Sequence, residues 1–62
     1  MEYKLRKGID ILISKGWKYL GNGNLEKEGR IINLDTIEDE GRISYLITED
    51  GHCKIYDYLT NL

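Results

Sequence analysis

Residues 30–58 read RIINLDTIEDEGRISYLITEDGHCKIYDY, and this stretch decides the fold that the sequence predicts. Apolar and polar residues alternate along three short runs, which is typical of β-strands. The runs are separated by two short turns that contain glycine. Because neighbouring antiparallel strands are commonly joined by such turns, we predict a three-stranded antiparallel meander over residues 30–58.

The turn at Asp50-Gly51 predicts the register of the second and third strands of this meander. Aspartate followed by glycine favours a two-residue type I′ turn, because both central residues of that turn need a positive φ. The predicted pairs are Glu49 with His52, Thr48 with Cys53, Leu46 with Ile55, Tyr45 with Tyr56, and Ile43 with Tyr58.

The other turn predicts the register of the first and second strands. Asp39-Glu40-Gly41 fits a three-residue loop in which the glycine adopts the left-handed conformation of a G1 bulge. The predicted pairs are Glu38 with Arg42, Ile37 with Ile43, and Leu34 with Leu46. In this register opposite charges pair and aliphatic side chains meet, which supports the assignment.

The predicted sheet has two apolar faces, although an antiparallel sheet with one solvated side normally alternates apolar and polar residues. One face carries Ile32, Leu34, Leu46, Cys53 and Ile55, and the other carries Ile31, Ile37, Ile43, Tyr45, Ile47, Tyr56 and Tyr58. A single helix covers only one of them, so the other would be covered by the first hairpin folded over it, by a second copy of the chain or by a partner. If a face stays uncovered, we expect it to be the tyrosine-rich one, because tyrosine tolerates partial hydration better than isoleucine or leucine.

Residues 3–15 predict an amphipathic helix. One face carries Leu5, Ile9, Leu12 and Ile13 at the spacing i, i+4, i+7 and i+8, and the opposite face carries Lys4, Lys7, Ser14 and Lys15, with Ile11 among the lysines. Gly16 follows where a helix would end with a left-handed residue. We therefore expect a helix that packs on the sheet through its aliphatic face and ends before Gly16.

Residues 14–24, SKGWKYLGNGN, contain three glycines around the only tryptophan. Gly16 and Gly21 match the spacing of the glycines in a phosphate-binding loop. Such a loop also needs Lys followed by Ser or Thr directly after the second glycine, and it leads from a strand into a helix. Here Asn22 follows Gly21, and the order is helix then strand. The stretch is therefore expected to supply a helix end and a turn.

Asn22-Gly23 predicts a hairpin over residues 17–28 that extends the meander. A tight two-residue turn would place Lys18 opposite Lys27, and this pair of like charges favours a wider turn. Trp17 either covers one face of the sheet or faces outward beside the helix lysines.

The chain has 62 residues, which predicts a single α+β domain over residues 1–62 with an N-terminal helix packed on a small antiparallel sheet. A domain of this size buries only about 60% of the surface of its unfolded chain, so a large substrate pocket would consume much of the core. We expect a protein that is not an enzyme and that binds no cofactor. Phe, Val, Ala, Pro and Gln are absent, which is typical of an AT-rich genome such as that of a low-GC bacterium or its phages.

The net charge of −2 is unevenly distributed. Residues 1–21 carry five basic and two acidic groups, a balance of +3, whereas residues 22–62 carry four basic and nine acidic groups, a balance of −5. A basic first third followed by an acidic remainder is typical of charge complementarity within the domain, or of a protein partner with a basic surface. With one cysteine and no apolar run near the ~20 residues that span a bilayer, we expect a cytoplasmic protein without membrane association.

His52 and Cys53 are neighbours, so in a strand their side chains point to opposite faces and cannot bind one metal ion together. A zinc site needs three or four ligands, and the sequence contains no other histidine or cysteine. We therefore expect no metal site. We expect Cys53 to be a small buried residue and His52 to face solvent beside the turn.

These observations favour a non-enzymatic protein-interaction module. We expect an accessory protein of a phage or mobile element that inhibits a host or defence protein by occlusion. The tyrosine-rich face would supply buried area, and the acidic turn would steer association with a basic surface. The expected contact residues are Tyr45, Tyr56, Tyr58, Ile43, Glu38, Asp39 and Glu40.

Two alternatives remain open at this stage. A homo-oligomer would bury the same tyrosine-rich face between copies of the chain. A nucleic-acid-binding module would combine helix lysines with the aromatic residues that follow, as proteins that bind single strands do. Its candidate residues are Lys4, Lys7, Lys15, Trp17, Lys18 and Tyr19. A net charge of −2 makes nucleic acid the less favoured partner.

Overall fold

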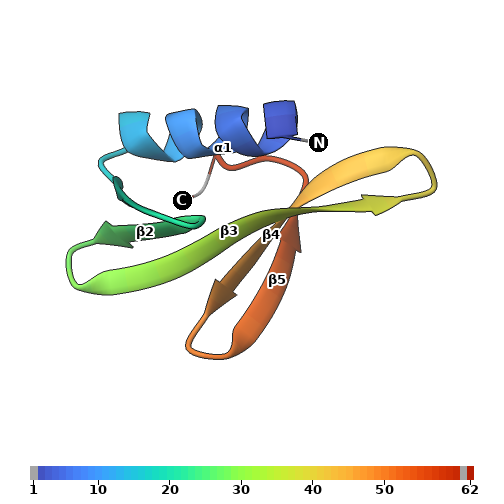
Figure 1. Ribbon diagram of the computed structural model, residues 1–62. Coiled ribbons are helices and arrows are strands. Elements are labelled where there is room, and N and C mark those ends of the chain that lie inside the picture. Colours follow the sequence, from blue (N-terminus) through green and yellow to red (C-terminus); the bar gives the residue numbers. More distant parts are fainter. Residues whose placement is uncertain (1, 61) are drawn as a thin grey trace.

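The computed structural model describes residues 2–60 and 62, which form one α-helix over a five-stranded antiparallel sheet (Figure 1). The elements are α1 (Glu2–Ser14), β1 (Lys18–Gly21), β2 (Asn24–Lys27), β3 (Arg30–Asp39), β4 (Arg42–Glu49) and β5 (His52–Tyr56). Each strand pairs with the next one along the chain. The predicted α+β class is confirmed, and the sheet contains both the predicted meander and the predicted first hairpin.

Four two-residue turns join the strands. Each has a non-glycine residue followed by glycine, both at positive φ: Asn22-Gly23, Glu28-Gly29, Glu40-Gly41 and Asp50-Gly51. This combination defines the type I′ turn, whose backbone twist matches the right-handed twist of the flanking strands. The strand order follows directly, because each turn returns the chain beside the strand that it has just left.

The turn between β3 and β4 differs from the predicted three-residue loop. Glu40 has a φ of 50° and Gly41 a φ of 80°, so these two residues alone close the turn. The structure pairs Asp39 with Arg42, Glu38 with Ile43, Ile37 with Ser44, Thr36 with Tyr45, and Leu34 with Ile47. The predicted pairs Glu38–Arg42, Ile37–Ile43 and Leu34–Leu46 are therefore wrong by one residue. The sequence did not indicate this register, because a glutamate rarely adopts a positive φ.

This shift changes which side chains share a face, because side chains alternate along a strand. Ile32 and Leu34 lie on the same face as Tyr45 and Ile47, and all four are buried. The predicted grouping of Ile32 and Leu34 with Leu46 is wrong. The expected exposure of the tyrosine-rich face is also wrong for Tyr45, whose exposed fraction is 5%.

The predicted register of β4 and β5 is confirmed from the Glu49–His52 pair to the Tyr45–Tyr56 pair. The predicted pair of Ile43 with Tyr58 is wrong, because β5 ends at Tyr56. The chain then returns to the side of the sheet that α1 covers (Figure 1), where Leu59 is buried in the core.

The predicted helix is confirmed, and its end has a defined structure. Gly16 has a φ of 100°. Its N–H donates to the carbonyl of Ile13, and the N–H of Trp17 donates to the carbonyl of Leu12, both over 3.0 Å. These two hydrogen bonds form a Schellman motif, which satisfies carbonyl groups at the helix end and needs the left-handed conformation that glycine adopts at low cost.

The face of α1 that packs on the sheet is rotated from the predicted one. Leu12 is fully buried at its centre, whereas Ile13 is 47% exposed and Ile11 packs against the core. Ile11 and Ile13 lie at about 100° on either side of Leu12, so the helical period alone could not choose between them. Lys4 and Lys15 are half-buried at the side of this face, which corrects their expected position opposite it.

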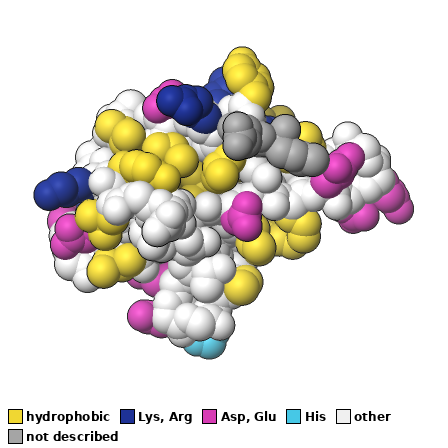
Figure 2. Space-filling model, in the orientation of Figure 1, with side chains coloured by type: hydrophobic (Ala, Val, Ile, Leu, Met, Phe, Trp, Pro, Cys, Tyr) yellow, Lys and Arg dark blue, Asp and Glu magenta, His cyan; other side chains and the backbone are white. Residues whose placement is uncertain are grey.

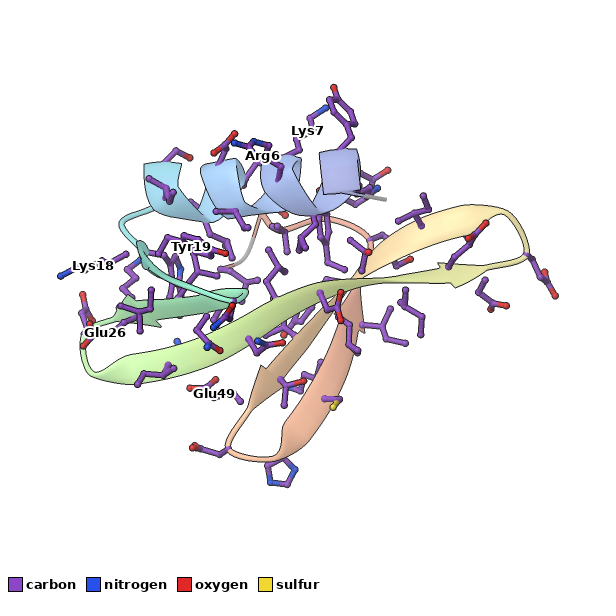
Figure 3. All side chains as sticks on the ribbon, viewed as in Figure 1. Arg6, Lys7, Lys18, Tyr19, Glu26 and Glu49 are labelled. Atoms are coloured by element: carbon purple, nitrogen blue, oxygen red, sulfur yellow. The ribbon has the colours of Figure 1, made fainter. Side chains whose placement is uncertain are left out.

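The first hairpin avoids the expected pair of lysines. A bulge between Tyr19 and Gly21 shifts the register, so that Lys18 lies opposite Glu26 and not opposite Lys27. Figure 3 shows Lys18 and Glu26 together at this end of the sheet. The turn itself is the tight one, and the extra residue lies in the strand.

Eight side chains form the buried core: Leu12, Trp17, Leu25, Ile32, Leu34, Tyr45, Ile47 and Leu59. Trp17 is only 3% exposed, and its Nε1 donates to the carbonyl oxygen of Leu62 over 3.4 Å. The cationic groups of Lys27 and Arg30 lie 5.9 and 5.5 Å from the centre of its ring. Trp17 therefore covers the sheet on the α1 side.

Gly8 allows α1 to pack closely on β4. A Cβ atom added at this buried position would lie 2.5 Å from Cε1 of Tyr45 and 3.1 Å from Cδ2 of Leu34. Both neighbours are buried, so neither side chain can move aside without disturbing the core.

We predict that Gly8→Ala destabilises the protein by about 1–2 kcal/mol, because overpacking exceeds the gain of about 1 kcal/mol in helix propensity. Urea unfolding followed by circular dichroism measures this change. Combined with Tyr45→Leu, which removes the ring, Gly8→Ala should no longer destabilise. A Gly8→Ala variant more stable than the parent would contradict the close packing.

Candidate interaction surfaces

The face of the sheet opposite α1 carries exposed aliphatic side chains. We call it the open face and define its apolar part by Ile31, Ile37, Leu46 and Ile55. Ile31 is 56% exposed, Ile55 is 61% exposed and Ile37 is 37% exposed, while Leu46 is half-buried. No helix or loop among residues 2–60 and 62 covers this face (Figure 1).

The strand register shows how these side chains are grouped. Asp35, Leu46 and Ile55 form one row across β3, β4 and β5. Ile37 is a diagonal neighbour of Leu46, so Ile37, Leu46 and Ile55 form one continuous apolar group. A row of polar side chains separates Ile31 from this group. It consists of Asn24, Asn33, Thr48 and Cys53.

The open face is also acidic. Asp35 is exposed at the end of the apolar row and accepts a hydrogen bond of 2.8 Å from the backbone N–H of Thr36. Asp57 follows the end of β5 at the edge of this face and is already engaged, since it accepts hydrogen bonds from Ser44 at 3.0 Å and from Arg42 at 3.4 Å. Arg42 is therefore occupied, and the carboxylate of Asp35 forms neither of the two ion pairs of the described residues.

Further acidic side chains lie at the tip of the β3–β4 hairpin, where Glu38, Asp39 and Glu40 are all exposed. Figure 2 shows acidic groups gathered at this projecting tip, and basic groups mainly over α1. The uneven charge of the sequence therefore becomes a separation of charge in space, with the sheet side acidic and the helix side basic.

The predicted contact residues do not form one surface. Tyr45 lies under α1, and its burial raises the pKa of its hydroxyl above the ordinary value. Tyr56 and Ile43 are half-buried on the same side of the sheet, and Tyr58 is 78% exposed beyond the end of β5. Only Glu38, Asp39 and Glu40 are exposed as expected, at the end of β3 and in the turn that follows it. The one-residue shift of β3 and β4 explains the difference, because it brings Ile32 and Leu34 beside Tyr45 for α1 to cover.

Cys53 is exposed on the open face, so the expectation that it is buried is wrong. Its Sγ lies 3.3 Å from Oγ1 of Thr48, the residue opposite it on β4. His52 is exposed beside the β4–β5 turn, as expected. No group of three or more His, Cys, Asp or Glu side chains in the described part of the chain is placed to hold a metal ion.

The candidate nucleic-acid residues fall into two groups. Lys4, Lys7 and Lys15 line one groove beside α1, together with Tyr3, which the sequence did not indicate, and Tyr58, which it indicated only as a contact to a protein partner. Lys18 and Tyr19 lie on β1 and do not line this groove. Trp17 is buried and offers no ring face to a base, so its predicted role as an exposed aromatic platform is wrong.

A groove of about 520 Å³ on the α1-facing side of β4 and β5 contains an ion pair. Arg30 donates two hydrogen bonds to Glu49, over 2.8 and 2.9 Å. These bonds lower the pKa of the Glu49 carboxyl below its ordinary value. His52 and Lys54 also line this groove. Glu49 is held by Arg30, so this groove presents a salt bridge and not a free general base.

Comparisons with family models, curated proteins and solved structures find no match to this chain. The described residues contain no helix that is long and apolar enough to cross a membrane. The geometry of the surfaces is therefore the basis for proposing what the protein does.

We predict that the thiol of Cys53 reacts with a maleimide in the folded protein at a rate within about tenfold of its rate in urea, because the side chain is exposed. Mass spectrometry of timed samples measures both rates. Thr48→Val serves as the control for the contact with Sγ. Protection by several orders of magnitude in dilute solution would show that the open face is covered.

Proposed function

We propose that the protein is a non-enzymatic interaction module that binds a protein partner through the open face. The observation that supports this is the exposure of Ile31, Ile37 and Ile55 on a sheet face that no described element covers. Burial of a half-exposed isoleucine contributes about 1 kcal/mol. Several such side chains on a rigid sheet provide an apolar contact without any change of fold.

The partner surface that fits this face combines aliphatic and basic side chains. Asp35 stands beside the apolar group, and Glu38, Asp39 and Glu40 extend the negative charge to the hairpin tip. A basic partner would be steered toward the face and would neutralise a carboxylate that becomes desolvated on binding. Two copies packed face to face would instead bring two Asp35 side chains into one interface, so we favour a different protein.

Occlusion is the mechanism that such a surface allows. A small domain that covers a functional basic surface of another protein inhibits that protein without catalysing a reaction. The proposed role is therefore that of an accessory protein of a phage or mobile element that acts on a host or defence protein. The proposed contact residues are Ile31, Ile37, Leu46, Ile55 and Asp35. The acidic residues at the hairpin tip, Glu38, Asp39 and Glu40, would steer association with the basic surface of the partner.

We predict that a photo-crosslinking residue at position 55 forms adducts with one defined protein in cells, whereas the same residue at position 13 does not. Ile13 is a matched control, because it is 47% exposed on α1 and Ile55 is 61% exposed on the open face. The adduct is identified by mass spectrometry, and the partner is then purified. Equal adducts from both positions would contradict a role for the open face.

With the purified partner, Ile31→Lys combined with Ile55→Lys should weaken binding by at least about 30-fold, because both changes place a charge in the buried contact. Ile13→Lys should leave the affinity unchanged, and circular dichroism verifies that all variants fold. Unchanged affinity of the double variant would overturn the proposal. Light scattering over a dilution series tests whether a second copy of the chain covers the open face instead. A dimer that Ile55→Lys dissociates would show that it does.

A further inference from the structure

A groove of about 340 Å³ runs between α1 and the segment that follows β5. It lies beside the helix, whereas the open face is on the other side of the sheet. Its lining combines three lysines, Lys4, Lys7 and Lys15, with aromatic side chains that include Tyr3 from α1 and Tyr58 from the segment after β5.

The helix and the turn that ends it place the three lysines along one side of this groove. Lys4, Lys7 and Lys15 follow helical spacing, with Ile11 between them against the core. The Nζ of Lys4 lies 5.1 Å from the centre of the Tyr45 ring, and the Nζ of Lys15 donates to the carbonyl of Thr60 over 3.0 Å. An ammonium group has three donors, so both can still bind an anion. Lys7 is exposed and projects from α1 (Figure 3).

The tyrosines come from the two ends of the chain. Tyr3 lies near the start of α1 and Tyr58 follows β5, and each side chain is 78% exposed. They are the most exposed large apolar side chains of the described residues. Two exposed rings that line one groove with lysines are the combination that binds single-stranded nucleic acids, in which bases stack on aromatic rings and phosphates contact cations.

The acidic side chain of the groove does not oppose this use. Asp57 also lines the groove, but Ser44 and Arg42 engage its two carboxylate oxygens. The exposed acidic residues Glu38, Asp39 and Glu40 lie at the tip of the β3–β4 hairpin and do not line the groove. The net charge of −2 therefore conceals a basic surface on one side of the molecule.

We propose that this groove binds single-stranded nucleic acid, with Lys4, Lys7 and Lys15 contacting phosphates and Tyr3 and Tyr58 stacking on bases. A single strand fits better than a duplex, because its bases are free to reach the rings. The proposal is independent of the open face, since no residue of the apolar group on that face lines the groove.

The number of lysines gives a quantitative expectation. Each phosphate neutralised on a single strand contributes about −0.7 to the slope of log K against log salt concentration, so three lysines predict a slope of about −2. Lys7→Gln should reduce the magnitude of the slope by about 0.7. Lys18→Gln on β1 is the matched control and should leave the slope unchanged.

The test uses fluorescence anisotropy of a fluorescein-labelled oligothymidylate of about ten nucleotides, a length within the usual site size. Binding at low salt with a slope near −2 is expected. Tyr58→Ala and Tyr3→Ala should each weaken binding about fivefold or more, whereas Tyr19→Ala should not. Circular dichroism verifies folding, and both groove tyrosines are exposed enough to be replaced without disturbing the core.

Three results would overturn the proposal: no binding at low salt, equal losses from the groove variants and the β1 controls, or a slope that Lys7→Gln does not change. Vesicles of phosphatidylserine form a separate arm. Binding to the vesicles alone, with the same dependence on Lys7 and Tyr58, would assign the groove to an anionic membrane surface instead. Ile55→Lys should leave oligonucleotide binding intact, so failure of the groove and failure of the open face are distinguishable.

Discussion

The two-residue turn at Glu40-Gly41 determines which side chains of β3 face α1, and most of the remaining structure depends on it. A strand has a side-chain period of two residues, so a turn longer by one residue would exchange the two faces of β3 relative to β4. The observed turn brings Leu34 opposite Ile47 and lets α1 cover both. The same turn leaves Ile37 and Leu46 together on the open face.

The size of α1 sets the second constraint. One helix of 13 residues packs on one side of the sheet, and Gly8 lets it approach Tyr45 closely. Nothing comparable among the described residues packs on the other side. The core is therefore complete with eight buried side chains, while exposed isoleucines remain on the opposite face. An apolar face that the fold leaves uncovered on a domain of this size is typical of a protein that binds another molecule.

The separation of charge gives the two proposed surfaces different partners. The open face combines isoleucines with Asp35 and lies near the acidic hairpin tip, which suits a basic protein surface. The groove beside α1 combines Lys4, Lys7 and Lys15 with two exposed tyrosines, which suits a polyanion with stacking bases. The surfaces lie on opposite sides of the sheet, so a small domain could bind both partners at once, with the rigid sheet between them.

The sequence by itself determined the helix and its end at Gly16, the α+β class, and the register of β4 and β5, because these follow from local periodicity and from turns that asparagine, aspartate and glycine favour. It could not decide the length of the turn at Glu40, whether Ile11 or Ile13 packs against the core, or the bulge beside Tyr19. At each of these positions the local sequence pattern is compatible with more than one arrangement. Only tertiary packing decided them: one helix can bury one face, and packing α1 on this face removes Ile32, Leu34, Tyr45 and Ile47 together from water. The exposed isoleucine face, and the meeting of Tyr3 and Tyr58 in one groove, are consequences of that choice.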